Sequence, residues 1–301
     1  MVVKRALRQA ASNLPQTWQA KLWYYRAHGR LPDLSQPRRF TERVFAQNLS
    51  PNHARFAELA DKVRVKDHVR RTLGPGFVVP TIWHGRSLPP RDQRWPAPFV
   101  LKANHGSGLN RLVRSERDLD WDSIEQDAAR WLRTSWPESL QEGWYNEIER
   151  QLLVEPLLSD GPDDLTDYKV LVFSWRAKLV QVDTVRFSNH ACAFYDPGWV
   201  RQPFEVAFPM QEGLQPRPRH LAQMLDAAEK LAQGFEFVRI DFYDLPEGPV
   251  FGEMTFSPGA GLVPFRRDEH DLAMGRLWEE GESSSAAHPS RHMSPEPGSS
   301  G

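Results

Sequence analysis

Two acidic residues near the end of the chain stand where paired strands would bring them together. They are Asp241, in the stretch 237–243, and Glu253, in the stretch 250–256. Both stretches alternate apolar with polar residues, which is the pattern of strands that bury one face. If they pair as an antiparallel hairpin with its turn at 245–248, a register that sets Asp241 opposite Glu253 gathers the apolar residues on one side. The sequence therefore predicts two facing carboxylates on a polar strand face.

The same register sets Arg239 opposite Thr255, beside the two carboxylates. Facing carboxylates repel each other unless a cation lies between them. Mg²⁺ binds through one or two carboxylates together with substrate phosphates, and an arginine is suited to a phosphate oxygen. The alternative is that Arg239 neutralises both acids in an exposed salt-bridge cluster. The hairpin by itself favours neither interpretation.

A second group of residues follows a short apolar stretch that ends in Lys102. The small-residue loop after it contains His105, Gly106, Ser107 and Gly108. A loop of small residues lets backbone N–H groups approach phosphates, and a lysine supplies a positive charge. The spacing is not that of a P-loop, and a plain loop is the alternative.

A third candidate is Glu155, which is followed by Pro156 and Leu157 at the end of an apolar stretch. A carboxylate there can accept a hydrogen bond from a ribose or an adenine amino group, whereas an edge-strand glutamate is more often just solvated. A serine or cysteine nucleophile is not indicated. The chain has no nucleophile-elbow motif, and its single cysteine, Cys192, lies in no activating motif.

Composition narrows the classes of protein that these residues can belong to. The chain has 301 residues, of which 40% are hydrophobic and 26% are charged, as in a globular protein of one large domain or two ordinary ones. Lys and Arg total 38 against 39 Asp and Glu, which argues against binding nucleic acid by bulk charge. One cysteine excludes an intrachain disulfide and a cysteine-rich zinc site.

No apolar run reaches the ~18–20 residues of a membrane helix. The start lacks the apolar core of a secretory signal, so we expect a soluble, cytoplasmic protein.

The candidate residues need a scaffold of both helices and strands. Helices are predicted at 38–48, 52–73, 118–133 and 219–233. Strands are predicted at 77–80, 98–102, 152–155, 168–173, 178–185, 237–243 and 250–256. Because the two kinds of element do not alternate regularly, the sequence favours an α+β fold over a doubly wound sheet.

The two ends of the chain differ from this middle part. Residues 1–37 are predicted to be a helical segment, in which Lys and Arg between Lys4 and Arg30 are mixed with aromatic residues. Such a helix either packs its aromatic residues on the body of the protein or lies on an anionic membrane surface, here the inner face, as a peripheral contact. Residues 281–301 are rich in Ser, Pro and Gly and are predicted to be a disordered tail.

Taken in chain order, these motifs resemble the ATP-grasp superfamily and, more specifically, its teichuronopeptide-biosynthesis (TupA-like) branch. The resemblance covers about residues 38–278. The strings that carry it are Phe40-Thr-Glu-Arg, Ala60-Asp-Lys-Val, Pro98-Phe-Val-Leu-Lys-Ala-Asn-His-Gly-Ser-Gly108, Asp167-Tyr-Lys-Val, Phe194-Tyr-Asp-Pro-Gly-Trp199, Phe237-Val-Arg-Ile-Asp-Phe-Tyr243 and Phe251-Gly-Glu-Met-Thr-Phe-Ser-Pro-Gly-Ala-Gly261.

The resemblance implies an ATP-grasp fold in which two α+β lobes sandwich the nucleotide. The body would span residues 38–280, with a small nucleotide lobe at about 98–158 and a catalytic lobe at about 159–280. The implied cofactors are ATP and Mg²⁺.

The resemblance also implies roles for individual residues around the nucleotide. Lys62 and Lys102 would contact the phosphates, and Lys66, one helical turn after Lys62, is the alternative to Lys62. The loop 105–108 would be a phosphate lid. Residues 155–157 would hold the adenine and ribose at the hinge. Lys169 would lie near the ribose or the phosphates.

The predicted hairpin would supply the transfer chemistry. Arg239 would hold the transferred phosphate, while Asp241 and Glu253 would bind Mg²⁺. Thr255 stands where the superfamily usually has a metal-binding Asn, and its hydroxyl can still bind Mg²⁺.

The activity that the resemblance implies is a carboxylate–amine ligase that works through an acyl phosphate. Its partner would be a small molecule or glycan with a carboxylate or an amine, belonging to a bacterial cell-surface polysaccharide or its precursor. The first alternative is a kinase that phosphorylates a sugar hydroxyl. The second, from another class, is a catalytically inactive glycan-binding or scaffold protein.

Overall fold

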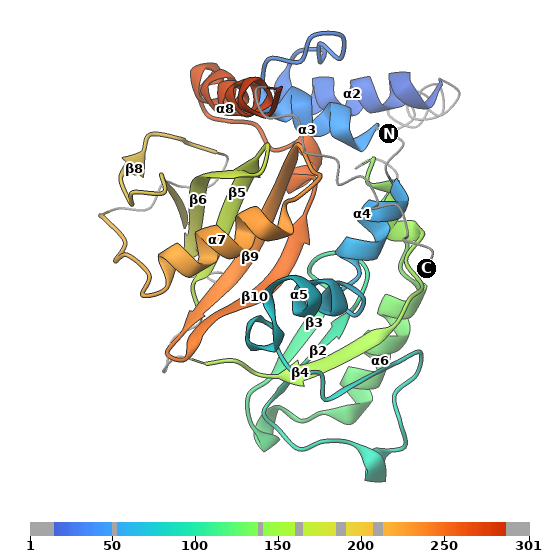
Figure 1. The fold of residues 1–301 in the computed structure, drawn as a ribbon. Coiled ribbons are helices and arrows are strands. Elements are labelled where there is room, and N and C mark those ends of the chain that lie inside the picture. The colour runs from blue at the N-terminus through green and yellow to red at the C-terminus, as the bar shows by residue number, and fades with distance from the viewer. Residues whose placement is uncertain are drawn as a thin grey trace, which may run out of the picture.

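The computed structural model of the chain describes residues 15–49, 53–137, 141–159, 165–184, 191–206 and 213–286. These residues form two antiparallel sheets with helices packed around them (Figure 1). The larger sheet has six strands in the order β10-β9-β5-β6-β7-β8, and the smaller sheet has four in the order β1-β4-β2-β3. The α+β class predicted from the sequence is therefore confirmed.

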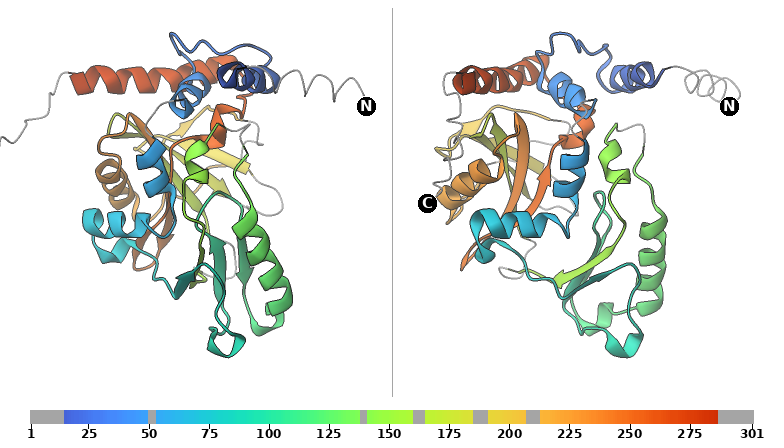
Figure 2. Two further views of the ribbon diagram at one scale, coloured as in Figure 1. Left: turned by 90° about the vertical axis from the view of Figure 1, so that its right-hand side faces the viewer. Right: turned by 45° about the vertical axis from the view of Figure 1, so that its right-hand side comes forward.

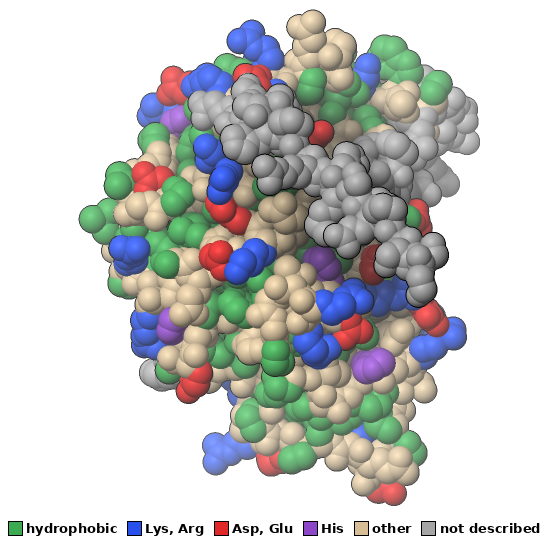
Figure 3. All heavy atoms as spheres, in the orientation of Figure 1, with side chains coloured by type: hydrophobic (Ala, Val, Ile, Leu, Met, Phe, Trp, Pro, Cys, Tyr) green, Lys and Arg blue, Asp and Glu red, His purple; other side chains and the backbone are tan. Residues whose placement is uncertain are grey.

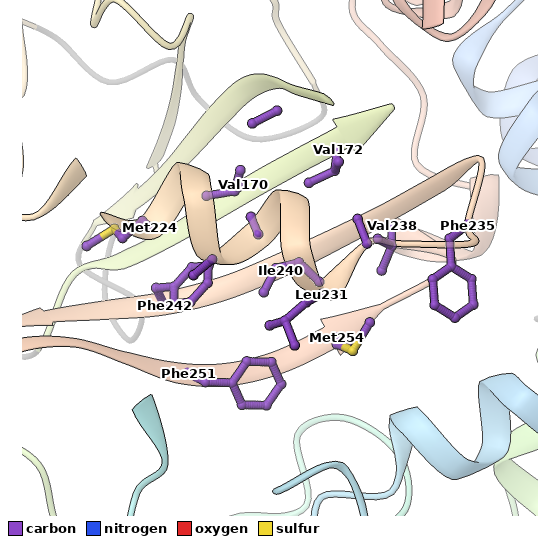
Figure 4. Close-up of a cluster of buried hydrophobic side chains, with 14 of the residues drawn as sticks. Val170, Val172, Met224, Leu231, Phe235, Val238, Ile240, Phe242, Phe251 and Met254 are labelled. Carbon is purple, nitrogen blue, oxygen red and sulfur yellow. The ribbon is translucent and has the colours of Figure 1, made fainter. Parts of the chain in front are cut away.

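The larger sheet contains the predicted C-terminal hairpin. Its strands are β5 (Asp167–Phe173), β6 (Arg176–Thr184), β7 (Ala191–Tyr195), β8 (Arg201–Gln202), β9 (Phe237–Leu245) and β10 (Gly248–Thr255). Side chains alternate between its faces, so Val170 packs with α7 (Leu221–Leu231) while Leu171 packs with the helices on the other side. Figure 4 shows α7 lying over β5 and β9, with Met224 and Leu231 among the core side chains.

The smaller sheet forms a second hydrophobic core with one helix. Its strands are β1 (Trp83–Gly85), β2 (Phe99–Ala103), β3 (Asn110–Val113) and β4 (Leu152–Pro156). The helix α6 (Trp121–Arg133) presents Ile124, Ala128 and Trp131, spaced by one helical turn each, to Leu101 and Val154 of the sheet. This sheet and α6 lie at the opposite end of the molecule from the helices α2, α3 and α8 (Figure 2).

The end of the molecule above the larger sheet consists of α2 (Gln16–His28), α3 (Phe40–Asn48) and α8 (Asp268–Ala286) (Figures 1 and 2). Thr41 joins α3 to α8, because its N–H and its hydroxyl donate to the carboxylate of Asp271 at 2.9 and 2.6 Å. The side chain of Arg39 donates to Asp268 at 2.7 Å. No helix in the described part of the chain is long and apolar enough to cross a membrane.

The predicted helix at 52–73 is wrong, because the structure has two helices there. They are α4 (His53–Ala60) and α5 (Val65–Leu73). The buried carboxylate of Asp61 lies between them and accepts the N–H of Val63 at 2.8 Å and the side-chain amide of Asn104 at 3.0 Å. The chain turns at 61–64, and α5 runs in a different direction from α4 (Figures 1 and 2).

Three further predictions differ from the structure. Residues 77–80 do not form a strand, because 75–77 are a short 3-10 helix. The carbonyl of Val79 accepts a hydrogen bond from Lys66 Nζ at 2.9 Å. Pro80 has no backbone N–H, so it cannot donate a hydrogen bond to a neighbouring strand. The short strands β1, β3, β7 and β8 were not predicted from the sequence. The predicted tail begins too early, since α8 continues to Ala286, and residues 287–301 lie outside the described part. Within the predicted N-terminal segment, α2 is helical and residues 1–14 lie outside the described part.

The close approach of α8 to the start of α3 gives a test of this packing. A Cβ at Gly275 would overlap the carbonyl oxygen of Arg38 and crowd Arg39. An alanine in the interior of a helix normally stabilises it by about 0.5–1 kcal/mol over glycine. We predict the opposite sign here: Gly275→Ala lowers the melting temperature measured by circular dichroism. Gly76→Ala is the control, because a Cβ at Gly76 meets no atom within 4 Å. A Gly275→Ala variant as stable as the wild type would contradict the packing.

Candidate active site

The hairpin of β9 and β10 has the register predicted from the sequence, with Asp241 opposite Glu253. The ladder shifts between Phe251 and Glu253, so that Gly252 is an extra residue, a β-bulge. Because of this bulge, Phe251 faces the apolar core while Glu253, two residues later, is on the polar side. A Cβ at Gly252 would lie 3.2 Å from the carbonyl oxygen of Asp241, so the small residue allows the close approach.

Arg239, which pairs with Thr255 across the same hairpin, binds both acids. Its Nε and Nη2 donate to the two oxygens of Asp241 at 2.7 Å each, and Nη2 lies 3.4 Å from Glu253 Oε1 and 3.0 Å from Thr255 Oγ1. The salt-bridge alternative from the sequence is thus the arrangement that the structure has. It differs in one respect: the side chain of Arg239 is only 13% exposed, so the cluster is largely buried.

The oxygen atoms of this cluster suit a hard cation. Burial raises the pKa of Asp241 to about 6, against the opposing effect of Arg239. The described residues contain no group of three or more His, Cys, Asp or Glu side chains that could hold a metal ion alone. Two carboxylates and the hydroxyl of Thr255 nevertheless fit Mg²⁺, because this ion takes part of its coordination from phosphate oxygens and water.

A cavity of about 460 Å³ lies next to the hairpin, within the usual size of a ligand site. Its walls come from the smaller sheet, from α5 and from the end of the hairpin. Its apolar lining includes Val65, Val79, Val100, Leu112, Leu153, Leu157 and Phe251. Its polar lining includes Lys62, Lys66, Lys102, Ser107, Gly108 and Glu155. An apolar pocket with cations at one side suits a planar ring that carries phosphates.

Glu155 binds two lysines at the wall of this cavity. Lys66 Nζ lies 2.5 Å from Glu155 Oε1, and Lys102 Nζ lies 2.6 Å from Glu155 Oε2. Burial opposes the charge of Glu155, but Lys102 and Lys66 hold the pKa of its carboxyl below the ordinary value. Burial lowers the pKa of Lys66, although Glu155 acts the other way. The three groups leave one positive charge in excess beside the cavity.

Lys62 connects the cavity with the hairpin. Its Nζ donates to the carbonyl oxygen of Gly106 at 2.8 Å and lies 3.6 Å from Glu253 Oε2. The break between α4 and α5 makes this position possible, because the N–H of Lys62 is bonded to the carbonyl of Asn104 at 3.1 Å. The small-residue loop, the lysine and the carboxylates are therefore direct neighbours.

The loop after β2 is anchored at its start and exposed at its tip. Asn104 and His105 are buried, and the Asn104 side chain binds Asp61 and the backbone on either side of Arg150. Gly106 has a φ of +87°, and a Cβ there would lie 2.7 Å from the ring of Trp136. Ser107 and Gly108 are exposed at the cavity.

Lys169 is buried in β5, opposite Asp241 in the ladder with β9. Its Nζ donates to Asp167 at 3.4 Å and contacts Asp183. It is absent from the lining of the cavity in the described residues, and its expected position near ribose or phosphates stays a prediction.

The sequence-predicted residues thus fall into three sets. Those that line the cavity are Lys62, Lys102, Ser107, Gly108, Glu155, Pro156 and Leu157. His105 and Gly106 are buried in the first part of the loop. Those on the strands beside it are Lys169, Arg239, Asp241, Glu253 and Thr255.

Other residues at the cavity were not among the predicted site residues. They include Asn110, Arg114 and Tyr243, whereas Lys66 was the sequence-based alternative to Lys62. Helical spacing gives a signal for Lys66, which stands one turn after Lys62. No sequence pattern pointed to Glu142. It is buried close to the loop, where its Oε2 accepts a hydrogen bond from the indole N–H of Trp136 at 2.9 Å. The Trp136 ring packs on Tyr145 with ring centres 4.5 Å apart.

The buried carboxyl of Glu142 predicts a pH dependence of stability. Burial raises its pKa to about 8, against the opposing effect of the hydrogen bond from Trp136. A carboxyl whose pKa is higher in the folded state binds more protons there, so its contribution is complete at low pH and is lost as the pH rises through about 8. We expect the melting temperature of Glu142→Gln to fall less than that of the wild type between about pH 5 and about pH 8.5.

The control for this measurement is Glu58→Gln, which changes an exposed glutamate on α4. This variant should follow the wild-type curve. A Glu142→Gln curve parallel to that of the wild type would show that Glu142 is ionised in the folded protein.

Comparisons with known proteins show which family the chain belongs to and which solved structures it resembles. The model of the TupA-like ATP-grasp family matches residues 42–279. No curated protein matches the chain. Among solved structures, the chain is similar to a D-alanine–D-alanine ligase from Helicobacter pylori, with 14% identity, a TM-score of 0.40, and coverage of 76% of this chain and 58% of that one. It is also similar to the ATP-grasp ligase PsnB in complex with its minimal precursor, with 14% identity, a TM-score of 0.42, and coverage of 78% and 63%.

A further similar structure is a D-alanine–D-alanine ligase from Bacillus anthracis, with 12% identity, a TM-score of 0.44, and coverage of 76% of this chain and 67% of that one. The chain thus spans only 58% of the Helicobacter enzyme and 63% of PsnB. The family model, in contrast, extends from α3 to α8 and includes both sheets and the cavity. The chain belongs to the TupA-like ATP-grasp family.

Proposed function

We propose that the protein is an ATP-dependent ligase that joins a carboxylate to an amine, acting on a bacterial cell-surface polysaccharide or its precursor in the cytoplasm. The observation that carries this proposal is the contact of Lys62 with both Gly106 and Glu253. It joins a ring-sized cavity with lysines at its wall to a polar strand face with two carboxylates and an arginine. Such an arrangement can hold a nucleotide triphosphate at one end and transfer its last phosphate at the other.

The cavity supplies the binding part of this proposal. The apolar walls between Val100 and Leu157 would enclose the adenine, and residues 155–157 would form its edge. Lys62 and Lys102 would contact the phosphates, with the tip of the loop, Ser107 and Gly108, closing over them. Lys66 would share this role or hold Glu155 in place.

The hairpin would supply the transfer step. Mg²⁺ would neutralise charge between the phosphates and the carboxylates of Asp241 and Glu253, with Thr255 as a further oxygen. Arg239 donates two hydrogen bonds to Asp241. With phosphate present, its guanidinium would also donate to the transferred group. A substrate carboxylate oxygen attacks the γ-phosphorus, the bond to the ADP oxygen breaks, and ADP leaves with the electron pair.

A second step would complete the amide. The amine nitrogen attacks the acyl carbon, inorganic phosphate leaves, and the amine loses a proton. Neither step needs a protein nucleophile, which agrees with a site made of lysine, arginine and carboxylates. The buried start of the loop and Trp136 behind it would help to keep water from the acyl phosphate.

The test of this proposal is a product analysis. The protein is mixed with ATP, Mg²⁺, candidate uronic acids and a pool of amino acids, and the products are identified by mass spectrometry and phosphate release. ADP, phosphate and an amide support the ligase. ADP with a phosphorylated sugar would indicate a kinase instead, and no ADP with any mixture would favour an inactive binding protein.

The carboxylates of the hairpin give the corresponding variants. We expect Asp241→Asn and Glu253→Gln to lower the rate of ADP formation by about a hundredfold or more, because each removes a charge that holds Mg²⁺. Asp226→Asn changes an exposed carboxylate of α7 that pairs with Lys230, and it should keep the wild-type rate. If either hairpin variant turns over ATP like the Asp226→Asn control, the assigned metal site is wrong.

Lys102 allows nucleotide binding to be measured apart from turnover. Loss of a charge-assisted hydrogen bond to phosphate costs ~1.5–3 kcal/mol, so Lys102→Ala should weaken ADP binding by about ten- to a hundredfold in calorimetry. Lys230→Ala, an exposed position on α7, is the matched control. Equal ADP affinity in all three proteins would place the phosphates elsewhere.

A further inference from the structure

The first described helix, α2, is held firmly to the body by one face. Ala20 and Tyr24 have no exposed surface, and the Tyr24 hydroxyl lies 2.8 Å from Thr41 Oγ1 on α3. One turn later, His28 Nε2 lies 2.8 Å from the carbonyl oxygen of Gly261. Because these residues are spaced by four along the helix, they fix its rotation about its own axis. The opposite face of α2 therefore has a fixed orientation toward solvent.

That opposite face carries large apolar side chains. Trp18, Leu22 and Tyr25 follow each other by four and three residues, so they form one stripe along the helix. They are 51%, 36% and 50% exposed, and Trp23 beside them is 39% exposed. This is half of the large hydrophobic residues that the described part of the chain exposes. From the sequence, one alternative was that α2 packs its aromatic residues on the body of the protein. Tyr24 does so, whereas Trp18, Trp23 and Tyr25 are exposed.

Positive charges flank the stripe. At 100° per residue, Lys21 and Arg26 project on either side of Trp18, Leu22 and Tyr25. Lys21 Nζ lies 5.3 Å from the centre of the Trp18 ring, and the Arg26 guanidinium carbon lies 5.4 Å from that of Trp23. The first 32 residues contain six Lys or Arg and no Asp or Glu, although the whole chain has a net charge of −1. The start of the sequence is thus rich in positive charge.

We propose that the exposed face of α2 binds an anionic lipid surface, with the helix lying in the plane of the headgroups. Tryptophan and tyrosine prefer the boundary between headgroups and acyl chains, while lysine and arginine on both flanks reach the phosphates of the lipids. α2 lies at an end of the molecule, away from the smaller sheet, so a flat surface can approach it (Figures 1 and 2). Hydrophobic side chains are visible at this end of the surface in Figure 3.

The charges around α2 favour lipid over a second copy of the chain. A twofold contact through this face would bring Lys21 and Arg26 of both copies together, and like charges would then oppose the contact. The acid nearest in sequence is Asp33, whose pKa is lowered by bonds from Ser35 and Gln36 and, to a smaller extent, by Lys21. Three hydrogen bonds, from the N–H and the hydroxyl of Ser35 and from the N–H of Gln36, already fall on its Oδ1. This inference does not depend on the proposed ligase activity.

The experiment is cosedimentation of the full chain with vesicles. One set contains phosphatidylglycerol and phosphatidylcholine, and the other contains phosphatidylcholine alone. We expect binding to the first set, weakened by salt, and little binding to the second. Two variants test the face separately: Trp18→Ser with Tyr25→Ser removes the apolar stripe, and Lys21→Glu with Arg26→Glu reverses the flanking charge. Each pair should weaken binding about tenfold or more.

The controls use exposed residues elsewhere. Leu214→Ser removes a side chain that is 76% exposed, and Lys230→Glu reverses a charge on α7; both should bind like the wild type. Melting temperatures check that every variant is folded. Absence of wild-type binding, equal binding to both vesicle sets, or wild-type binding by the α2 variants would overturn the proposal. A dimer in sedimentation velocity that Trp18→Ser dissolves would also overturn it, because the face would then join two copies.

Discussion

The guanidinium of Arg239 is the group around which the strands of the candidate site are arranged. Two carboxylates on one strand face are stable together only if a cation offsets their repulsion, and Arg239 does so through bonds to Asp241, Glu253 and Thr255. The bulge at Gly252 is part of the same solution, because it turns Glu253 to the polar side while Phe251 stays in the core. Without the arginine, both oxygens of Asp241 would lose their 2.7 Å bonds, and Lys62 would be left 3.6 Å from Glu253.

The charges of the site alternate in sign from the cavity to the hairpin. Lys66 and Lys102 share Glu155, Lys62 approaches Glu253, and Arg239 holds Asp241. Each positive group is thus already balanced in part by a protein carboxylate. A phosphate chain that enters the site has to compete with these carboxylates, and a divalent cation restores the balance that it disturbs. Nucleotide and metal are therefore expected to bind more tightly together than separately.

Most of the fold and much of the site follow from local sequence pattern. The alternation of apolar and polar residues in 237–243 and 253–256 gives the register that sets Asp241 opposite Glu253. The bulge at Gly252, which places Phe251 on the core face, was not predicted. The break at Asp61 could not be foreseen, because it depends on Asn104, which is distant in sequence. The same holds for Glu142, whose burial comes from tertiary packing and not from its neighbours. The contact of Arg239 with both acids was foreseen as an alternative, but its burial was not.

The packing of α3 on α8 joins the two ends of the described chain. Thr41 bonds to Asp271 across 230 residues of sequence, and Arg43 bonds to Glu279 across 236. Phe237 of β9 stacks on Trp278 of α8, with ring centres 4.8 Å apart. On a ribosome that adds about 5–20 residues per second, α3 therefore waits at least about ten seconds for its partner. Until α8 emerges, apolar side chains on one face of these strands, such as Phe237, lack the cover that Trp278 gives them.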